Sequence, residues 1–240
     1  PIYPAKRTAV IGGGGKTPAL ARLAARCRDA HVLLTTTTHI LPFAPPVCDR
    51  LCVTPDAGAL RAALQAPGVT CAGMAAGDGK LTALPAPLWE LACQQADFIF
   101  YEADGAKRLP LKLHAAHEPV IQPETDWCLV VAGLSAWGKP VGQAVHRYAL
   151  RPEWAAEPGR PVDAAVILAC VQDAIAACGM PQARLAVLLN QADAVEPAQA
   201  QDVARRLEHA GLQCVACSLR TQPFPHLAGP LWDTDGRPGR

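Results

Sequence analysis

Thr8 to Thr17 form the stretch whose residue types and spacing most clearly indicate chemistry: Thr-Ala-Val-Ile-Gly-Gly-Gly-Gly-Lys-Thr. The apolar, β-branched run predicts a buried strand, followed by a loop of bare backbone and the start of a helix. The loop consists of Gly12, Gly13, Gly14 and Gly15. Because no side chain blocks the approach, its N–H groups can surround a phosphate, while Lys16 adds a positive charge and Thr17 a hydroxyl for Mg²⁺. The stretch therefore predicts a nucleotide site.

The spacing of this glycine loop departs from the usual P-loop motif, Gly-x-x-x-x-Gly-Lys-Ser/Thr, because Val10 occupies the position of its first glycine. What remains is Gly-x-x-Gly-Lys-Thr, a shorter loop similar to that of Mur-type ligases. The alternative is a glycine-rich turn whose lysine is solvated. Pro18 is compatible with a helix that starts here, because first-turn N–H groups have no partner within the helix.

A pair of carboxylates follows a second apolar run. The segment from Asp97 to Tyr101 predicts a strand, and Glu102 and Asp104 come directly after it. Carboxylates at the end of a strand can hold Mg²⁺ and orient an attacking nucleophile beside a phosphate loop. Because they are two residues apart, both can point to the same side. The alternative is an ordinary acidic loop beside a lysine.

Four threonines end the predicted strand at 31–34, and His39 follows them. Hydroxyls at the carboxyl end of a parallel strand face the crevice in which such sheets bind ligands, so we expect Thr37 to reach the metal or a phosphate. The alternative is the general preference of threonine for strands.

The segment after the carboxylates carries three cations, Lys107, Arg108 and Lys112, which together with His39 are expected to bind a second, anionic substrate. His114 and His117 also lie here at metal-ligand spacing, but we favour a solvated loop for both histidines.

A base-binding motif is indicated by Asn190-Gln-Ala-Asp193, which follows an apolar strand at 185–189. It resembles the Asn-Lys-x-Asp motif of GTPases, with Gln191 in place of the lysine, and Ser218 stands where those proteins place a backbone loop under guanine. We therefore expect GTP to be favoured over ATP, with weaker selectivity than in a true GTPase. The alternative is that the motif caps the helix predicted from Pro197, because Asn and Asp are favoured at such positions.

The elements that position these residues alternate between buried strands and helices. Strands are predicted near Thr8, His31, Asp97, Trp127, Leu185 and Cys214, and helices at 18–27, 56–65, 86–95, 161–178 and 197–210, with Thr54 capping the second helix. This alternation predicts one α/β, P-loop NTPase-like domain over residues 1–220, with a mainly parallel sheet covered by helices on both faces. Gly77-Asp-Gly79 predicts a small antiparallel hairpin, at an edge of the sheet or as an insert, and residues 221–240 are predicted to form an irregular tail.

Composition excludes several classes of function. The 240 residues are 50% hydrophobic and carry a net charge of only +1, so a broad basic surface for nucleic acid or an anionic membrane is not expected. No apolar run approaches the length of a membrane span and no signal peptide is recognisable, so we expect a soluble, cytoplasmic protein. The ten cysteines are expected to be reduced core residues. A metal or redox role stays open for the pairs Cys48/Cys52 and Cys214/Cys217.

Several motifs together resemble the YqeC-type family, the accessory proteins of selenium-dependent molybdenum hydroxylases. They are Ile11 to Thr17, Leu34 to His39, Tyr101 to Lys112, His117 to Pro119, Val131 to Leu134 with Gly138 and Lys139, and Asn190 to Asp193. The resemblance implies a P-loop nucleotide-binding fold and a role in maturing a molybdenum enzyme, with the enzyme or its cofactor-maturation proteins as partners.

Two classes of function follow. The first is a Mg²⁺-dependent NTPase or group-transfer enzyme, in which Lys16, Glu102 and Asp104 are catalytic and Thr17, Thr37, Glu102 and Asp104 hold the metal. An ATP-dependent kinase or ligase on a small anionic substrate would use the same site. The second is a nucleotide-gated binding protein or chaperone with little turnover, in which GTP or ATP orders loops.

Overall fold

A computed structural model describes residues 5–222 of the chain. The helices are α1 (Lys16–Arg26), α2 (Ala57–Leu64), α3 (Ala86–Gln95), α4 (Val141–Ala144), α5 (Pro152–Ala156), α6 (Ala164–Cys178) and α7 (Pro197–His209). The strands are β1 (Arg7–Gly12), β2 (His31–Thr36), β3 (His39–Ile40), β4 (Arg50–Val53), β5 (Gly68–Ala75), β6 (Leu81–Thr82), β7 (Phe98–Glu102), β8 (Leu111–Lys112), β9 (Trp127–Gly133), β10 (Val145–His146), β11 (Leu185–Asn190) and β12 (Gln213–Ala216).

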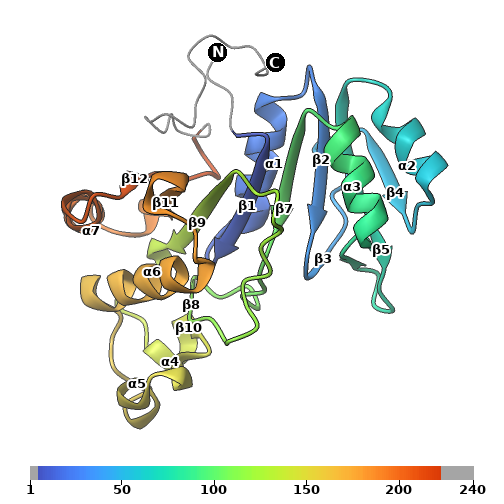
Figure 1. Cartoon of the computed structure of the whole chain (residues 1–240). Helices are drawn as coiled ribbons and strands as arrows, with labels where there is room; N and C mark the ends of the chain where they lie inside the picture. Colours follow the sequence, from blue (N-terminus) through green and yellow to red (C-terminus); the bar gives the residue numbers. More distant parts are fainter. Residues whose placement is uncertain (1–4, 223–240) are drawn as a thin grey trace.

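A single large sheet runs through the described residues in the order β12-β11-β9-β1-β7-β2-β5-β6-β3, with β4 added beside β5 (Figure 1). The six strands predicted from the sequence are all present and all pair in parallel. The predicted α/β class with a mainly parallel sheet is therefore confirmed. After β7 the chain crosses β1 to form β9, so the strand order reverses around β1, the arrangement that opens a crevice at the carboxyl ends of the strands.

Helices cover both faces of this sheet, as alternation along the strands requires. In β1, Ala9 and Ile11 point into the core formed with α2, α3, α6 and α7, whereas Val10 points into the core formed with α1. Figure 1 shows α1 on the opposite side of the sheet from α3 and α6. A separate two-stranded parallel sheet joins β8 to β10 beside the main sheet.

The carboxyl ends of the central strands are aligned. Val10 pairs with Glu102, Gly12 with Val131, and Asn190 with Gly133. The glycine loop, the carboxylates and the base motif therefore leave the sheet at the same edge.

The predicted hairpin around Gly77 is only partly correct. Met74 and Ala75 pair antiparallel with β6, as expected, but the rest of β5 pairs in parallel with β2 and β4. β5 is therefore a member of the central sheet rather than an insert, whereas β6 lies toward one edge of the sheet, as predicted for the hairpin. Residues Gly68 to Gly73 are all buried, as expected for a mainly apolar strand inside a parallel sheet.

Two predicted helix caps are also corrected. Asp56, not Thr54, caps α2, because its carboxylate accepts from the Ala59 N–H at 2.8 Å. Glu196 is the N-cap of α7, and its N–H donates to Gln199 Oε1 at 3.1 Å. The alternative in which Asn190 and Asp193 cap α7 is therefore wrong.

All ten cysteines are free, including the pairs Cys48/Cys52 and Cys214/Cys217. Over residues 5–222, no helix has the length and apolar character needed to cross a membrane. The tail predicted for 221–240 lies, beyond residue 222, outside the described residues.

Candidate functional site

The glycine loop between β1 and α1 is packed against other backbone segments. Gly12, Gly14 and Gly15 have φ values of 93°, 77° and 136°, which side chains rarely tolerate. A Cβ at Gly12 would lie 2.2 Å from the Val131 carbonyl oxygen, and one at Gly15 would lie 2.1 Å from Asn190 Nδ2. Glycine is therefore required here by close backbone approach as well as by any bound phosphate.

Several amides of the loop already have partners in this structure. Gly13 N–H donates to the Val131 carbonyl at 2.9 Å, and Gly14 N–H donates to the Leu109 carbonyl at 3.1 Å. Gly12 N–H donates to Asp104 Oδ2 at 2.9 Å. This differs from the expectation that the N–H groups of the whole loop surround a phosphate. The donors that remain by general rule are the first-turn amides of α1, at Lys16 and Thr17, because such groups lack partners within the helix.

Lys16 turns back toward the sheet. Its Nζ donates to the Gly12 carbonyl at 2.7 Å and lies 2.8 Å from Asp104 Oδ1 and 3.8 Å from Glu102 Oε1. Both carboxylates thus face the lysine, as their spacing predicted. The side chain is only 5% exposed, so the positive charge of the loop is held by buried carboxylates.

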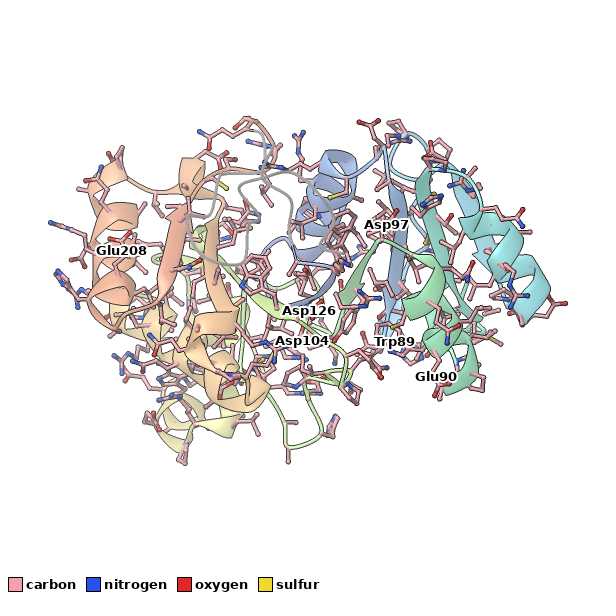
Figure 2. The ribbon with its side chains drawn as sticks, turned by 45° about the horizontal axis from the view of Figure 1, so that its top comes forward. Trp89, Glu90, Asp97, Asp104, Asp126 and Glu208 are labelled. Carbon is pink, nitrogen blue, oxygen red and sulfur yellow. The ribbon has the colours of Figure 1, made fainter. Side chains whose placement is uncertain are left out.

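Asp104 is fully buried, and its two carboxylate oxygens differ: Oδ2 accepts hydrogen bonds, whereas Oδ1 has the ion pair with Lys16 but no hydrogen bond. Besides Lys16 and the Gly12 amide, its Oδ2 contacts His114 Nε2 at 2.7 Å. Burial opposes ionisation of Asp104, but Lys16 and the hydrogen bond from His114 outweigh it and hold its pKa well below the usual value. In Figure 2 Asp104 lies in the interior, whereas Glu90 and Glu208 lie on outer helices.

His114 is the functional candidate that the sequence misassigned. The loop containing it was expected to be solvated, but His114 is buried and lies between two carboxylates, Asp104 and Asp173, with Nδ1 2.8 Å from Asp173 Oδ2. Burial lowers the pKa of His114, but the hydrogen bonds to the two aspartates raise it above the usual value. A signal was present in the alternation Leu111, Leu113 around Lys112, which indicates a buried segment. His117 is exposed, as expected.

Lys112 is also placed differently from the prediction. It was expected to contact a second substrate, but it is 2% exposed, and its Nζ lies 2.6 Å from the Gly105 carbonyl and 2.7 Å from Glu118 Oε2. Asp104 Oδ2 lies 3.4 Å away. The ammonium group therefore neutralises buried carboxylates and is not presented to a ligand.

Glu102 differs from Asp104, two residues away, in two respects: it lines a cavity, and its pKa is shifted upward instead of downward. It ends β7 and lines a cavity of about 650 Å³. Burial raises its pKa to about 7, against the opposing effect of Lys16 and with a further upward contribution from Asp104. A carboxyl group with this pKa can hold or release a proton near neutral pH.

The cavity beside Glu102 also brings together most of the other predicted residues. Its walls include the glycine loop from Gly13 to Gly15, Lys16, Thr17, His39, Lys80, Lys107 and Arg108. Thr17 is exposed in the first turn of α1. Thr37 does not line this cavity, because its hydroxyl donates to the Val120 carbonyl at 2.8 Å.

A second cavity, of about 480 Å³, lies next to the first. It is lined by Gly15, Pro18, Ser135, Asn190, Gln191, Asp193, Ala194, Ser218 and Arg220. Both cavities are lined by Gly15, Pro18 and Gln191. The end of the glycine loop therefore lies at the boundary between the two cavities. The Gln191 side chain accepts from Ser135 Oγ at 2.7 Å.

Asn190 connects three segments at this second cavity. Its Nδ2 donates to the Gly14 carbonyl at 2.8 Å, and its Oδ1 accepts from the Leu219 N–H at 3.0 Å. Asp193 is exposed and lies 3.0 Å from the Arg220 guanidinium. The Ser218 hydroxyl, together with Arg220, lowers the pKa of Asp193, which is therefore ionised at neutral pH.

Comparison with known proteins places this site in a family. Residues 8–149 match the sequence model of a family described as YqeC protein, and this span contains the glycine loop and both carboxylates. The chain belongs to the YqeC family. A curated relative, the "Uncharacterized protein YqeC" of Escherichia coli (strain K12), is 33% identical over an alignment of 147 residues that covers 58% of this chain and 56% of that protein.

The chain thus spans little more than half the length of that YqeC relative. The segment from Asn190 to Arg220 lies beyond the residues matched by the family model. No solved structure matches this chain.

Proposed function

We propose that this YqeC-family protein binds a nucleoside triphosphate together with Mg²⁺, and that it hydrolyses the nucleotide or transfers a group from it. The observation that carries the proposal is the pair of adjoining cavities that meet at Gly15. One contains the loop, the lysine and the first turn of a helix, which suit phosphates. The other contains Asn190, Asp193 and Ser218, which suit a purine base.

Mg²⁺ fits a reduced version of the predicted ligand set. Thr17 and Glu102 both line the larger cavity, and a site of this type takes most of its oxygens from phosphates and water. Asp104 does not fit as a direct ligand, because it is fully buried and both its oxygens are engaged. In the part of the chain that the structure describes, no three His, Cys, Asp or Glu side chains form a metal-binding group.

Each residue of the site would have a distinct role in the proposed reaction. Lys16 and the first-turn amides of α1 stabilise charge on the phosphates. Asp104 orients Lys16 and the Gly12 amide and is a positioning residue rather than a metal ligand. Glu102 faces the cavity and accepts a proton from, or orients, the attacking group. The bound cation would supply charge neutralisation between the phosphates.

A nucleotide-gated role is favoured by a specific observation. The Leu109 carbonyl accepts the hydrogen bond of the Gly14 amide, and Lys16 is paired with Asp104. A triphosphate that bound the whole loop would therefore have to displace both contacts. Such a displacement would couple binding to movement of residues 105–110. The resemblance to accessory proteins of selenium-dependent molybdenum hydroxylases suggests the partner. It would be a maturing molybdenum enzyme, or the proteins that supply its cofactor, with different affinities for the nucleotide-free and nucleotide-bound forms.

Titration of the full chain with fluorescent GTP tests the proposal. Lys16→Ala should weaken binding at least tenfold, about the effect of losing a charge-assisted hydrogen bond, whereas Lys139→Ala, at an exposed lysine that lines neither cavity, should not. Because Lys16 is a buried partner of Asp104, thermal unfolding is measured alongside. Thr17→Ala is the second variant, at an exposed position, and should weaken binding with Mg²⁺ but not with EDTA. Equal affinity in folded Lys16→Ala and parent protein would refute the proposal.

Competition between GTP and ATP tests the choice of base. The Asp193 carboxylate can accept from the guanine N1–H and 2-amino groups, which adenine lacks, and an unpaired polar group costs about 1–3 kcal/mol. GTP should therefore compete better than ATP, and Asp193→Ala should remove the difference. Tighter binding of ATP, or a preference unchanged in Asp193→Ala, would show that the motif only holds the loops together.

A further inference from the structure

The cavity beside the glycine loop carries more positive charge than a nucleotide complexed with Mg²⁺ requires. Its lining includes Lys16, Lys80, Lys107 and Arg108, whereas Glu102 is the carboxylate among its lining residues. Lys16 and the first-turn amides of α1 suffice to meet the phosphates, whose charge a bound cation already offsets in part. Of the remaining cations, Lys107 and Arg108 would be left without an anionic partner.

Lys107 and Arg108 are the cations available for such a partner. Both are exposed, and among residues 5–222 neither side chain forms an ion pair. Lys80, by contrast, already contacts Asp78, and Lys112 of the same segment is buried against Glu118. Lys112 therefore has a structural role, whereas Lys107 and Arg108 line the cavity.

The backbone conformation at Lys107 and Arg108 also indicates that these two residues have a role in binding. Lys107 and Arg108 have φ values of 47° and 64°, the left-handed region that residues with a Cβ enter only at an energetic cost. The next residue, Leu109, holds the segment against the Gly14 amide at 3.1 Å. The strained turn therefore places both cations beside the glycine loop, where the terminal phosphate of a nucleotide would lie.

We infer that Lys107 and Arg108 form a subsite for a second, small anionic ligand, one bearing carboxylate or phosphate groups, that binds beside the nucleotide. The inference deepens the proposed function and rests on it, because it identifies the second ligand as the acceptor in phosphoryl transfer. An oxygen of this ligand would form a bond to the terminal phosphorus as the bond from that phosphorus to the nucleoside diphosphate breaks, and the diphosphate would leave. A volume of about 650 Å³ holds both a triphosphate and a small acid, within the usual range for ligand pockets. Glu102 then lies in the same cavity as both ligands.

The experiment uses the full chain and inorganic phosphate and citrate as probes. Each probe is titrated calorimetrically into protein saturated with a non-hydrolysable GTP analogue and Mg²⁺, so that the glycine loop is filled. The test variant is Lys107→Asn/Arg108→Asn, because asparagine tolerates positive φ and carries no charge. The matched control is Lys139→Asn/Arg205→Asn, which removes one lysine and one arginine at exposed positions outside both cavities.

The test variant should bind at least one probe about tenfold or more weakly than the parent, with affinity for the GTP analogue unchanged within about threefold. The control variant should match the parent in both titrations. If neither probe binds the parent, or if the test variant binds both as well as the control does, the subsite is refuted. An equal loss of affinity for the GTP analogue would also overturn it, because the two cations would then belong to the nucleotide site.

A separate arm distinguishes failure of this inference from failure of the proposed function. The GTP analogue is first titrated alone, and absence of binding there would refute the nucleotide site itself. The probes are then titrated into nucleotide-free protein. Loss of probe binding in the test variant under that condition would still support an anion subsite at Lys107 and Arg108.

Discussion

Glu102 provides the sharpest test of the electrostatics of the site. It is 8% exposed at the end of β7, and burial raises its pKa from 4.5 to about 7, despite the nearby Lys16. The folded protein therefore favours the protonated carboxyl group, and ionising it costs stability. Replacing Glu102 with Gln removes the ionisation while keeping nearly the same shape and a polar end group.

The sign and size of the effect follow from linkage. Between pH 4.5 and about 7 the folded state holds a proton on Glu102 that the unfolded state has released, so stability falls as pH rises across this interval. The difference between the two pKa values corresponds to up to about 3 kcal/mol. Glu102→Gln should therefore be more stable than the parent by up to about 3 kcal/mol at pH 8, and the two should converge toward pH 5.

Urea unfolding in EDTA from pH 5 to pH 8 measures this difference directly. EDTA matters because a bound cation would favour the ionised carboxylate and oppose the shift. Glu208→Gln, at an exposed position on α7, is the matched control and should differ little from the parent at any pH. A Glu102→Gln protein that is less stable than the parent at pH 8, or a difference that does not vary with pH, would refute the reasoning.

Two further predictions concern the buried parts of the site. His114→Asn breaks the contacts with both aspartates and should lower the free energy of unfolding by about 2–4 kcal/mol, whereas His117→Asn, at an exposed position, should change it by less than about 0.5 kcal/mol; similar urea midpoints would contradict the buried role. Gly15→Ala should lower the melting temperature much more than Gly138→Ala, because both have positive φ but only Gly15 lies against Asn190. Equal shifts in calorimetry would mean that backbone strain alone matters.

The fold was predictable where local sequence decides structure. The runs at Leu185 and Phe98 are continuous apolar segments between predicted helices, the pattern typical of buried parallel strands. The helix at Ala86–Gln95 has the predicted bounds, because Pro85 and Pro87 fix its start. The role of β5 was missed, because the turn signal at Gly77-Asp-Gly79 favoured a hairpin with β6 and hid the parallel pairing of the same strand with β2 and β4.

The candidate site was predictable in its members but not in their roles. The order of strand, glycines and lysine indicates which residues gather at the edge of the sheet, since carboxyl ends of parallel strands meet there. Whether a given side chain faces solvent or the core depends on partners elsewhere, such as Asp173 for His114 and Glu118 for Lys112. The three cations Lys107, Arg108 and Lys112 were therefore predicted to share one role, although only the first two of them line the cavity.

The contrast between Glu102 and Asp104 explains why so many charges lie beneath the glycine loop. Removing one partner from a buried ion pair leaves an unpaired charge, which is strongly destabilising, so a lysine paired only with Asp104 could not turn toward a phosphate. Asp104 Oδ2 keeps two other partners, the imidazole of His114 at 2.7 Å and the ammonium group of Lys112 at 3.4 Å. Lys16 can therefore leave Asp104 for a ligand while the buried carboxylate stays compensated. On the proposed function, His114 and Lys112 are what make the lysine of the loop free to act.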